Sequence, residues 1–424
     1  METLPEMYLG KHVRELPTPS LVIDEEKFNS NCAKMLENVL HLAEQTAHPI
    51  LFRAHIKTHK TTEGTLRQLG FEGTGGKLRS KAVLVSTIKE ANGILDFQEF
   101  LNKTFVDDIA FSLPSIIPET LESLSALSSR VANLRIFIDN IEHLDILKKF
   151  GKPANGKKWS IFIKLDMGSH RAGLDIDSQE FFDILDKMKE KDIQDVAILY
   201  GFYAHAGHSY GSKSIQEANG YLLDEVKAVN TAAEIASSFI NPKALVLSVG
   251  ATPTSNALAL TENKKLIKYI KEEMVAPLEI HCGNYACYDL QQYSTGCIKL
   301  EEISCFVLGS IISKYPKRNE ALTNTGVLAL ARETSSTKGL GLSIQLENYL
   351  SSRNHIEVTS YVDRVSQEHG ILKPWKGKEG NWNIGEKIAI LPQHACITMA
   401  QFPYYFVINN KGIVVDLWKP HQKW

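Results

Sequence analysis

The stretch SIFIKLDMGSHRAG, residues 160–173, begins with a run of β-branched and aromatic residues and ends in polar and glycine residues. A segment rich in Leu, Glu and Lys at three-to-four spacing follows over residues 178–191. A second β-type run, ILYGFYAH, covers residues 198–205. This succession predicts a strand, a helix and a second strand, and strands joined in this way pair in parallel.

The same succession recurs along much of the chain. The runs that we expect to be strands are Ser20–Asp24, Leu51–Ile56, Ala82–Ser86, Leu134–Asp139, Ser160–Asp166, Ile198–His205, Ala244–Gly250 and Leu278–Gly283. Eight such runs in about 260 residues predict an α/β fold with a closed (β/α)8 barrel of the TIM type. A doubly wound open sheet is the alternative.

The pattern changes after residue 285. Short β-type pieces such as CFVLGSIIS, IEVTSYV and KIAILP are separated by Gly, Asn and Pro, which predicts a mainly-β domain. The NNKG sequence at Asn409–Gly412, between YYFVI and IVVDLW, is typical of a hairpin turn. We therefore expect a barrel over residues 20–285 and a β domain over residues 286–424, with residues 1–19 packed alongside the β domain.

Composition excludes several classes of protein. The 424 residues carry 47 Lys and Arg against 49 Asp and Glu, so a net charge of −2 provides no bulk attraction for nucleic acid or anionic lipid. No apolar run approaches the roughly 20 residues that cross a bilayer, and the first residues lack the pattern of a targeting peptide. The six cysteines form no CxxC pair, which argues against a disulfide scaffold and a structural zinc cluster. We expect a cytoplasmic protein with a small-molecule substrate.

The densest group of reactive side chains is RAHIKTHKT, Arg53–Thr61, which follows the second expected strand. Its end is expected at the carboxyl-terminal face of the barrel, where barrels of this kind place their active sites. A lysine that is partly removed from water at such a mouth becomes competent as a Schiff-base nucleophile. Lys57 is our candidate, and a solvated basic turn is the alternative.

Glycine and polar residues also gather at the ends of other expected strands. They occur in KLDMGSHRAG (164–173), YAHAGHSY (203–210), SVGATPTSN (248–256) and HCGNY (281–285). Each loop alone is typical of a structural turn. Several oriented backbone N–H groups with hydroxyl and amide donors can together surround a phosphate without much net charge. A phosphate-bearing cofactor would explain all of these loops at once.

A second group lies far downstream, in LPQHACITM, residues 391–399. His394 and Cys396 are two apart in an apolar stretch that we expect to be a strand, so both side chains would point to one face. An imidazole and a thiolate on one face make a partial zinc site with open positions, as catalytic zinc requires. A buried cysteine beside a hydrogen-bonded histidine is the alternative.

Taken together, these motifs resemble the eukaryotic D-serine dehydratases, and most of all their fungal form. These are pyridoxal-phosphate enzymes of the alanine-racemase-like fold, known as fold type III. The motifs that carry the resemblance are RAHIKTHK, KLDMGSHRAG, YAHAGHSY, GATPTS, HCGNY and PQHAC, in this order over nearly the whole chain. The resemblance implies pyridoxal phosphate on Lys57, a zinc ion held by His394 and Cys396, and a homodimer. It also implies cofactor contacts from Arg171, Tyr203 and Tyr210, and phosphate contacts from Gly250, Thr252, Gly283 and Asn284.

The implied reaction converts D-serine to pyruvate and ammonia. We expect Lys57 to form the Schiff base and then take the Cα proton as general base, and zinc to activate the departing hydroxyl. If Tyr203 faces the ring nitrogen, its neutral phenol cannot hold that nitrogen protonated. The ring is then a weaker electron sink, and metal assistance becomes more necessary.

Three other functions remain open at this point. A D-threonine aldolase, or another lyase acting on a β-hydroxy-D-amino acid, would share the fold and the lysine motif. A non-catalytic carrier of pyridoxal phosphate would not need the residues beyond the barrel. A zinc hydrolase would not use Lys57. The roles of His55, His59 and the SQEHG cluster at Ser366–Gly370 are unassigned.

Overall fold

The computed structural model describes residues 5–75, 78–240, 242, 244–260, 263–377 and 379–424. These residues form two compact units. One unit contains residues 33–57, 64–283 and 423–424, and we call it the barrel unit. The other contains residues 1–32, 58–63 and 284–422, and we call it the sheet unit.

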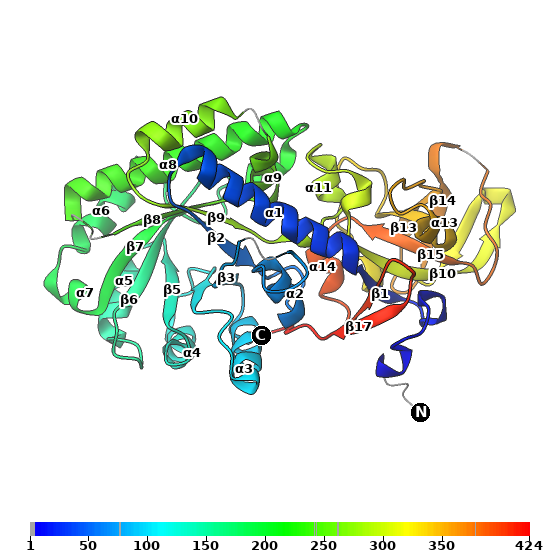
Figure 1. Cartoon of the computed structure of the whole chain (residues 1–424), viewed down its shortest axis with the longest axis horizontal. Coiled ribbons are helices and arrows are strands. Elements are labelled where there is room, and N and C mark those ends of the chain that lie inside the picture. The colour runs from blue at the N-terminus through cyan, green and yellow to red at the C-terminus, as the bar shows by residue number, and fades with distance from the viewer. Residues whose placement is uncertain (1–4, 76–77, 241, 243, 261–262, 378) are drawn as a thin grey trace. The chain divides into compact units, whose positions relative to one another are not determined.

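Parallel strands close into a barrel in the first unit, as the sequence predicts (Figure 1). Within the described residues there are eight of them: β2 (Ile50–His55), β3 (Ala82–Val85), β4 (Asp108–Phe111), β5 (Asn133–Ile138), β6 (Trp159–Leu165), β7 (Ala197–Ala204), β8 (Val246–Val249) and β9 (Leu278–Cys282). The barrel closes where β2 pairs with β9, for example Arg53 with His281. The fold is therefore a TIM-type α/β barrel followed by a mainly-β part.

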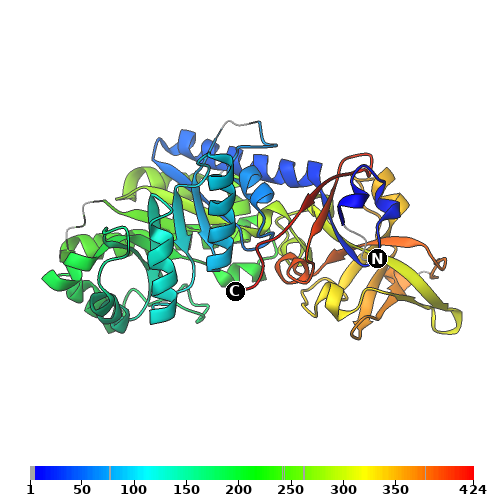
Figure 2. The same ribbon diagram turned by 90° about the horizontal axis from the view of Figure 1, so that it is seen from below.

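Helices surround these strands, and Figure 2 shows them outside the barrel in blue, cyan and green. They are α1 (Glu25–Thr46), α2 (Thr62–Gln68), α3 (Ile88–Leu101), α4 (Pro118–Ser128), α5 (Ile141–Phe150), α6 (Gln179–Lys187), α7 (Lys191–Val196), α8 (Ile215–Ile240), α9 (Thr252–Asn256) and α10 (Lys264–Glu273). The boundary between the two units falls inside α1. Apolar faces explain the packing, because Leu222, Val226 and Val229 of α8 are wholly buried.

One of the eight expected barrel strands is wrong. Ser20–Asp24 is a strand, β1, but it pairs antiparallel with β10 and parallel with β16 in the sheet unit. All five of its residues are buried, so it reads as the continuous apolar run that is also typical of a barrel strand. The barrel uses β4 (Asp108–Phe111) instead, and this four-residue strand was not expected from the sequence.

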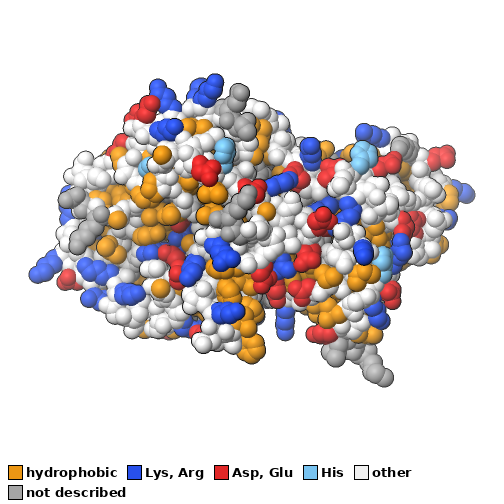
Figure 3. Space-filling model, in the orientation of Figure 1, with side chains coloured by type: hydrophobic (Ala, Val, Ile, Leu, Met, Phe, Trp, Pro, Cys, Tyr) orange, Lys and Arg blue, Asp and Glu red, His pale blue; other side chains and the backbone are white. Residues whose placement is uncertain are grey.

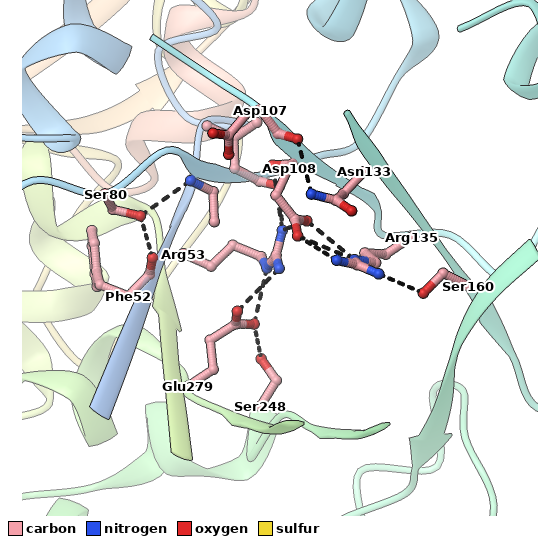
Figure 4. Close-up of polar contacts among 12 residues, drawn as sticks. Phe52, Arg53, Ser80, Asp107, Asp108, Asn133, Arg135, Ser160, Ser248 and Glu279 are labelled. Carbon is pink, nitrogen blue, oxygen red and sulfur yellow. Dashed lines mark hydrogen bonds and ion pairs between the residues drawn. The ribbon is translucent and has the colours of Figure 1, made fainter. Parts of the chain in front are cut away.

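The interior of the barrel holds a chain of side chains with alternating charge (Figure 4). Arg53 on β2 is wholly buried and forms ion pairs with Glu279 on β9 and Asp108 on β4. Asp108 also pairs with Arg135 on β5 at 2.8 Å, and the Ser248 hydroxyl donates to Glu279 at 2.8 Å. Burial opposes ionisation of Asp108, but Arg53 and Arg135 prevail and lower the pKa of this carboxyl. This network satisfies charges that would otherwise be costly to bury.

The sheet unit is built on a large sheet whose strand order is β11-β14-β13-β12-β15-β10-β1-β16-β17, nine strands among the residues that the structure describes. The remaining strands are β10 (Cys305–Tyr315), β11 (Glu320–Thr323), β12 (Gly341–Gln345), β13 (Ser360–Val365), β14 (Gly370–Pro374), β15 (Lys387–Pro392), β16 (Tyr405–Ile408) and β17 (Val414–Trp418). Its helices are α11 (Leu290–Ser294), α12 (Val327–Leu330), α13 (Leu346–Ser351) and α14 (Ala395–Met399).

Two turns of the large sheet agree with the sequence. β16 and β17 form the expected antiparallel hairpin around Asn409–Gly412, where Gly412 has a φ of +73°. The SQEHG cluster lies at the turn between β13 and β14, where residues 366–369 are exposed. That cluster is therefore a surface turn within this unit.

The surface carries mixed charge, as the net charge of −2 suggests. On the face shown in Figure 3, acidic and basic side chains are interspersed and form no continuous patch of one sign. No helix among the described residues is long and apolar enough to cross a membrane. Within the described residues, none of the six cysteines forms a disulfide.

Candidate active site

Positive charge gathers at the carboxyl ends of the barrel strands. Lys57 follows β2 by two residues and is half-buried. Lys164 on β6 is 8 % exposed and has no ion pair among the described residues. Burial lowers the pKa of Lys164 to about 8, helped by the charges of Arg171 and Lys57 and opposed by Asp139 and Asp166. The charges of Lys57, Lys164 and Arg171 therefore act on one another, and such a group of cations favours an anionic ligand.

Tyr203 lies among aromatic rings in this part of the barrel. It stacks on His281 with ring centroids 4.1 Å apart and an interplanar angle of 12°, and it meets Phe137 edge to face at 4.8 Å. Burial raises the pKa of Tyr203 far above its usual value. The phenol of Tyr203 therefore stays neutral, as expected for a side chain that cannot keep a cofactor ring nitrogen protonated.

His205 is a neutral imidazole beside the cationic group. Burial lowers its pKa to about 3, and the charges of Lys57, Arg171 and Lys164 act in the same direction. Its Nδ1 lies 2.7 Å from the carbonyl oxygen of Gly250, so Nδ1 carries the proton and donates. The other ring nitrogen, Nε2, is thereby left as an acceptor.

Two of the expected phosphate contacts are glycines for steric reasons. Gly250 has a φ of +148°, and a Cβ there would lie 2.0 Å from the carbonyl oxygen of His281. A Cβ on Gly283 would lie 2.5 Å from the carbonyl oxygen of His55. Only glycine allows these loops to approach the neighbouring strands so closely.

The remaining expected cofactor contacts of the barrel unit lie in loops after β6, β7 and β8. Thr252 begins α9 and is 3 % exposed, and Tyr210 belongs to the 3-10 turn Gly207–Gly211. Arg171 is exposed, in a loop that Asp166 organises by accepting from the backbone N–H groups of residues 168, 169 and 170. The buried hydroxyl of Ser209, in the loop after β7, has no hydrogen-bond partner among the described residues. Cationic side chains and an unused donor fit a phosphorylated cofactor.

The pair His394 and Cys396 belongs to the sheet unit, but it does not lie on a strand as expected. β15 ends at Pro392, His394 caps the amino end of α14, and Cys396 lies in the first turn of that helix. The apolar letters around the pair cannot distinguish a strand from a short buried helix. The two side chains nevertheless act on each other, because Cys396 raises the pKa of His394.

Polar groups of the sheet unit surround the thiol of Cys396. The hydroxyl of Thr58 lies 3.1 Å from its sulfur, and the amide nitrogen of Asn284 lies 3.8 Å from it. Asn284, expected from the resemblance to contact phosphate, also donates to Asp289 at 2.7 Å. Its carbonyl oxygen Oδ1 is buried without a partner among the described residues.

Acidic groups face the imidazole of His394. Glu333 Oε2 lies 3.5 Å from Nδ1 of His394. Burial alone would lower the pKa of His394, but Cys396, Asp289 and Glu333 raise it to about 9. An imidazole and a thiol, with a carboxylate on the far ring nitrogen, are a donor set that suits zinc.

The described residues contain no group of three or more His, Cys, Asp and Glu side chains arranged to hold a metal ion. His394 and Cys396 would therefore supply two ligands and leave other positions open. The expected site residues fall into two sets. Lys57, Arg171, Tyr203, Tyr210, Gly250, Thr252 and Gly283 belong to the barrel unit, and Asn284, His394 and Cys396 belong to the sheet unit.

Three further residues that lie near the expected site residues were missed from the sequence. Lys164 begins the KLDMGSHRAG motif and lies on β6. The alternation of side chains along a strand could have placed it on the inner face of the barrel. Glu333 and Glu225 gave no signal, because they reach the site residues only through folding. His55 and His59 differ in place: His55 contacts Ser86 on the barrel side, whereas His59 is buried in the sheet unit beside Thr61 and Phe28.

Comparison with known proteins agrees with this architecture. Residues 31–271 match the model of the family described as "Alanine racemase, N-terminal domain". Residues 304–408 match the family described as "Putative serine dehydratase domain". The first family implies pyridoxal phosphate as the cofactor of the barrel.

Full-length relatives identify the family. The chain is 54 % identical over 433 aligned positions to "D-serine dehydratase" of Saccharomyces cerevisiae, with complete coverage of both sequences. The chain belongs to the D-serine dehydratase family. It is also 40 % identical to the D-serine dehydratase of Schizosaccharomyces pombe, covering 100 % of this chain and 96 % of that one. The chain is therefore a lyase of the D-serine dehydratase class, and the sequence-based identification of its family is confirmed.

A solved structure of another enzyme shares the fold of this D-serine dehydratase family member. It is a mutant of D-threo-3-hydroxyaspartate dehydratase in the metal-free form, with a TM-score of 0.78 and 24 % identity. The match covers 98 % of this chain and 100 % of that one. The alanine-racemase-like fold expected from the sequence is thereby confirmed.

Proposed function

We propose that this D-serine dehydratase uses pyridoxal phosphate bound to Lys57 and a zinc ion held by His394 and Cys396. The single observation that best supports cofactor binding is the group of Lys57, Lys164 and Arg171 at the carboxyl ends of the barrel strands. Arg171, Tyr203, Tyr210, Gly250, Thr252, Gly283 and Asn284 are the proposed cofactor contacts. The products are pyruvate and ammonia.

Side chains of the barrel unit would bind the cofactor and transfer the substrate proton. Lys57 would hold the cofactor through its amine and, once that amine is free, accept the proton from the substrate Cα. Pyridoxal phosphate, when bound, supplies an electron sink that stabilises negative charge at Cα. If Tyr203 faces the ring nitrogen, its neutral phenol cannot keep that nitrogen protonated, and the electron sink would then be weak.

The leaving group explains why a metal is proposed. Hydroxide is a poor leaving group, and a weak electron sink gives little help in expelling it. A zinc ion at His394 and Cys396 would act as a Lewis acid toward the substrate hydroxyl. Loss of water from D-serine gives 2-aminoacrylate, which adds water and releases ammonia to give pyruvate. The related D-threo-3-hydroxyaspartate dehydratase, one form of which is called metal-free, supports a metal in this class.

Substrate class and stereochemistry are tested together by incubating the purified enzyme with D-serine and L-serine separately. We expect keto acid from D-serine alone, and Lys57→Ala should abolish it. Glycine and an aldehyde from D-threonine would favour an aldolase, a function suggested by the 22 % identical D-threonine aldolase of Arthrobacter. Chelation should remove turnover while the visible absorbance of the bound cofactor remains.

We also propose a cytoplasmic homodimer. Leu328 on α12 and Ile397 on α14 are large exposed apolar side chains, and these two helices pack against each other in the sheet unit. Exposed apolar side chains of this kind, close to Cys396 in the chain, are better explained by contact with a second copy of the chain than by exposure to water. Light scattering should give the mass of a dimer, and Leu328→Asp should give that of a monomer.

A further inference from the structure

A buried carboxyl group links two of the loops proposed to hold phosphate. Glu225 belongs to α8 and is wholly buried. Its Oε1 accepts a hydrogen bond of 2.6 Å from the backbone N–H of Ala206, in the loop after β7. Its other oxygen, Oε2, is buried without a hydrogen-bond partner among the described residues. The backbone of Gly250 and the hydroxyl of Thr254, in the segment after β8, lie near this carboxyl and act to lower its pKa. One side chain thus lies beside groups at the ends of two neighbouring strands.

Glu225 has no ion-pair partner in the described part of the chain, which makes its burial costly. Burial raises the pKa of this carboxyl to about 8, even though the hydrogen bond from Ala206 and the nearby groups of Thr254 and Gly250 act to lower it. An apolar side chain would fill this place in α8 at less cost, as Leu222 and Val226 do nearby. The carboxyl is therefore explained by the loops it contacts rather than by the packing of the helix.

The segment after β8 has little freedom of its own. Gly250 approaches the backbone of β9 so closely that no Cβ fits, and Ala251 donates its N–H to the Thr254 hydroxyl at 2.8 Å. Glu225 acts on the same segment from α8. Residues 250–254 are therefore held between α8 and β9, while the loop beginning at Ala206 is held by Glu225 as well.

We propose that Glu225 is a positioning residue for phosphate: it fixes the loops after β7 and β8 in the arrangement in which their donors bind the phosphate of the cofactor. This inference rests on the proposed function, in which these loops hold pyridoxal phosphate. The role requires no contact between Glu225 and the cofactor.

The experiment compares two ligands of the apoenzyme that differ only in the phosphate. The dissociation constants of pyridoxal phosphate and of pyridoxal are measured by titration of the visible absorbance. The dissociation constant of pyridoxal divided by that of pyridoxal phosphate reports phosphate recognition, and this ratio is independent of catalysis. We expect Glu225→Leu to lower this ratio about tenfold or more, because it removes the hydrogen bond to Ala206 and the carboxyl group beside the segment after β8. Glu225→Gln keeps an acceptor oxygen and should stay within a few-fold of the wild type.

Asn230→Ala is the matched control on the same helix. Asn230 is wholly buried and donates to the Tyr269 hydroxyl and the Glu273 carbonyl, away from both loops. Its replacement should lower thermal stability but leave the ratio unchanged. If Glu225→Leu does not fold, Thr254→Val removes a hydroxyl that lies near the Glu225 carboxyl and should lower the ratio several-fold.

The outcomes separate this inference from the proposed function. A wild-type apoenzyme that binds pyridoxal as tightly as pyridoxal phosphate would show that these loops hold no phosphate, and both proposals would fail. A wild-type preference for phosphate that persists in Glu225→Leu, or in Thr254→Val, would overturn the role of Glu225 alone. A loss as large in Asn230→Ala would also overturn it, since general weakening of α8 would then be the cause.

Discussion

The two ring nitrogens of His394 have different surroundings. Glu333 Oε2 lies 3.5 Å from Nδ1, which makes no hydrogen bond among the described residues. We expect this carboxylate to orient the ring when a metal is bound at Nε2. Glu333→Gln should weaken zinc binding about tenfold or more, because carboxylate partners of metal-bound histidines contribute on that scale. Competition with a chromophoric chelator measures this. Glu368→Gln, at an exposed turn of the same unit, is the control, and equal zinc affinity in both variants would contradict the orientation.

Glu225 makes a second prediction at the scale of the residue, which concerns stability and pH. Its folded pKa of about 8 lies above the value of about 4.3 for an unfolded chain. Between these values the folded state binds a proton that the unfolded state lacks, so this residue's contribution to stability falls as pH rises. The free energy of unfolding of the wild type should therefore fall relative to Glu225→Gln by up to about 1.4 kcal/mol per pH unit. Urea unfolding at pH 5, 6.5 and 8 tests this, and parallel pH dependences would refute it.

Two glycines show how strongly context decides the effect of one methyl group. Gly250→Ala would place Cβ 2.0 Å from a backbone oxygen at a φ of +148°, and we expect a loss of more than about 3 kcal/mol. Gly220 lies exposed within α8 with nothing within 4 Å of a built Cβ. Gly220→Ala should instead stabilise the protein by about 0.5–1 kcal/mol. Thermal unfolding of both variants provides the measurement, and a tolerated Gly250→Ala would show that the β8 segment can move.

At the scale of the element, the sequence predicts the barrel because its strands repeat with helices between them. It assigns β1 wrongly, because a short run buried on both sides looks the same in a barrel and in the centre of a mixed sheet. It misses β4, whose four residues begin with a charged Asp108. That aspartate is acceptable inside the barrel only because Arg53 and Arg135 meet it, a pairing across strands that no local pattern reveals.

The same distinction applies to the candidate site. Lys57 and the glycine loops follow strands and Tyr203 lies near the end of β7, so their common face could be predicted from topology alone. The setting of His394 and Cys396 could not, because their segment turns from β15 into α14 between two apolar stretches. Glu225 and Glu333 act on the site residues through long-range contacts and were invisible in the sequence.

The ion network of the barrel strands gives a prediction about the element. Arg53→Met would leave Glu279 buried with no cation and should lower the free energy of unfolding by about 3–5 kcal/mol. Arg53→Met combined with Glu279→Met should recover part of this loss, because the uncompensated charge is removed. Asp108 adds a pH signature: its lowered folded pKa contributes stability that is present above its usual pKa and is lost as pH falls through the folded value. Urea unfolding of single and double variants decides the matter, and additive losses would contradict a coupled network.

At the scale of the whole molecule, the sheet unit is assembled from separate parts of the chain. Residues 1–32 and 58–63 join residues 284–422, so the domain boundaries expected at residues 20 and 285 differ from the observed units. Figure 2 shows this, with the N-terminal segment in dark blue among the yellow, orange and red strands of the sheet unit. β1 lies between β10 and β16, in the interior of the large sheet rather than at its edge. The sheet is therefore incomplete without the first strand of the chain.

A truncation tests this dependence directly. Removing residues 1–24 deletes β1 and exposes the unpaired edges of β10 and β16, although β2–β9 of the barrel all remain. Unpaired interior edges invite aggregation and lose the backbone hydrogen bonds of two ladders. We expect the truncated chain to lose the protease resistance of residues 284–422, whereas a chain that begins at residue 5 should retain it. Limited proteolysis with mass spectrometry measures both, and a protected sheet unit without β1 would show that residues 284–422 fold on their own. If protection returns when a peptide of residues 5–32 is added, the loss is due to the missing strand rather than to damage elsewhere in the chain.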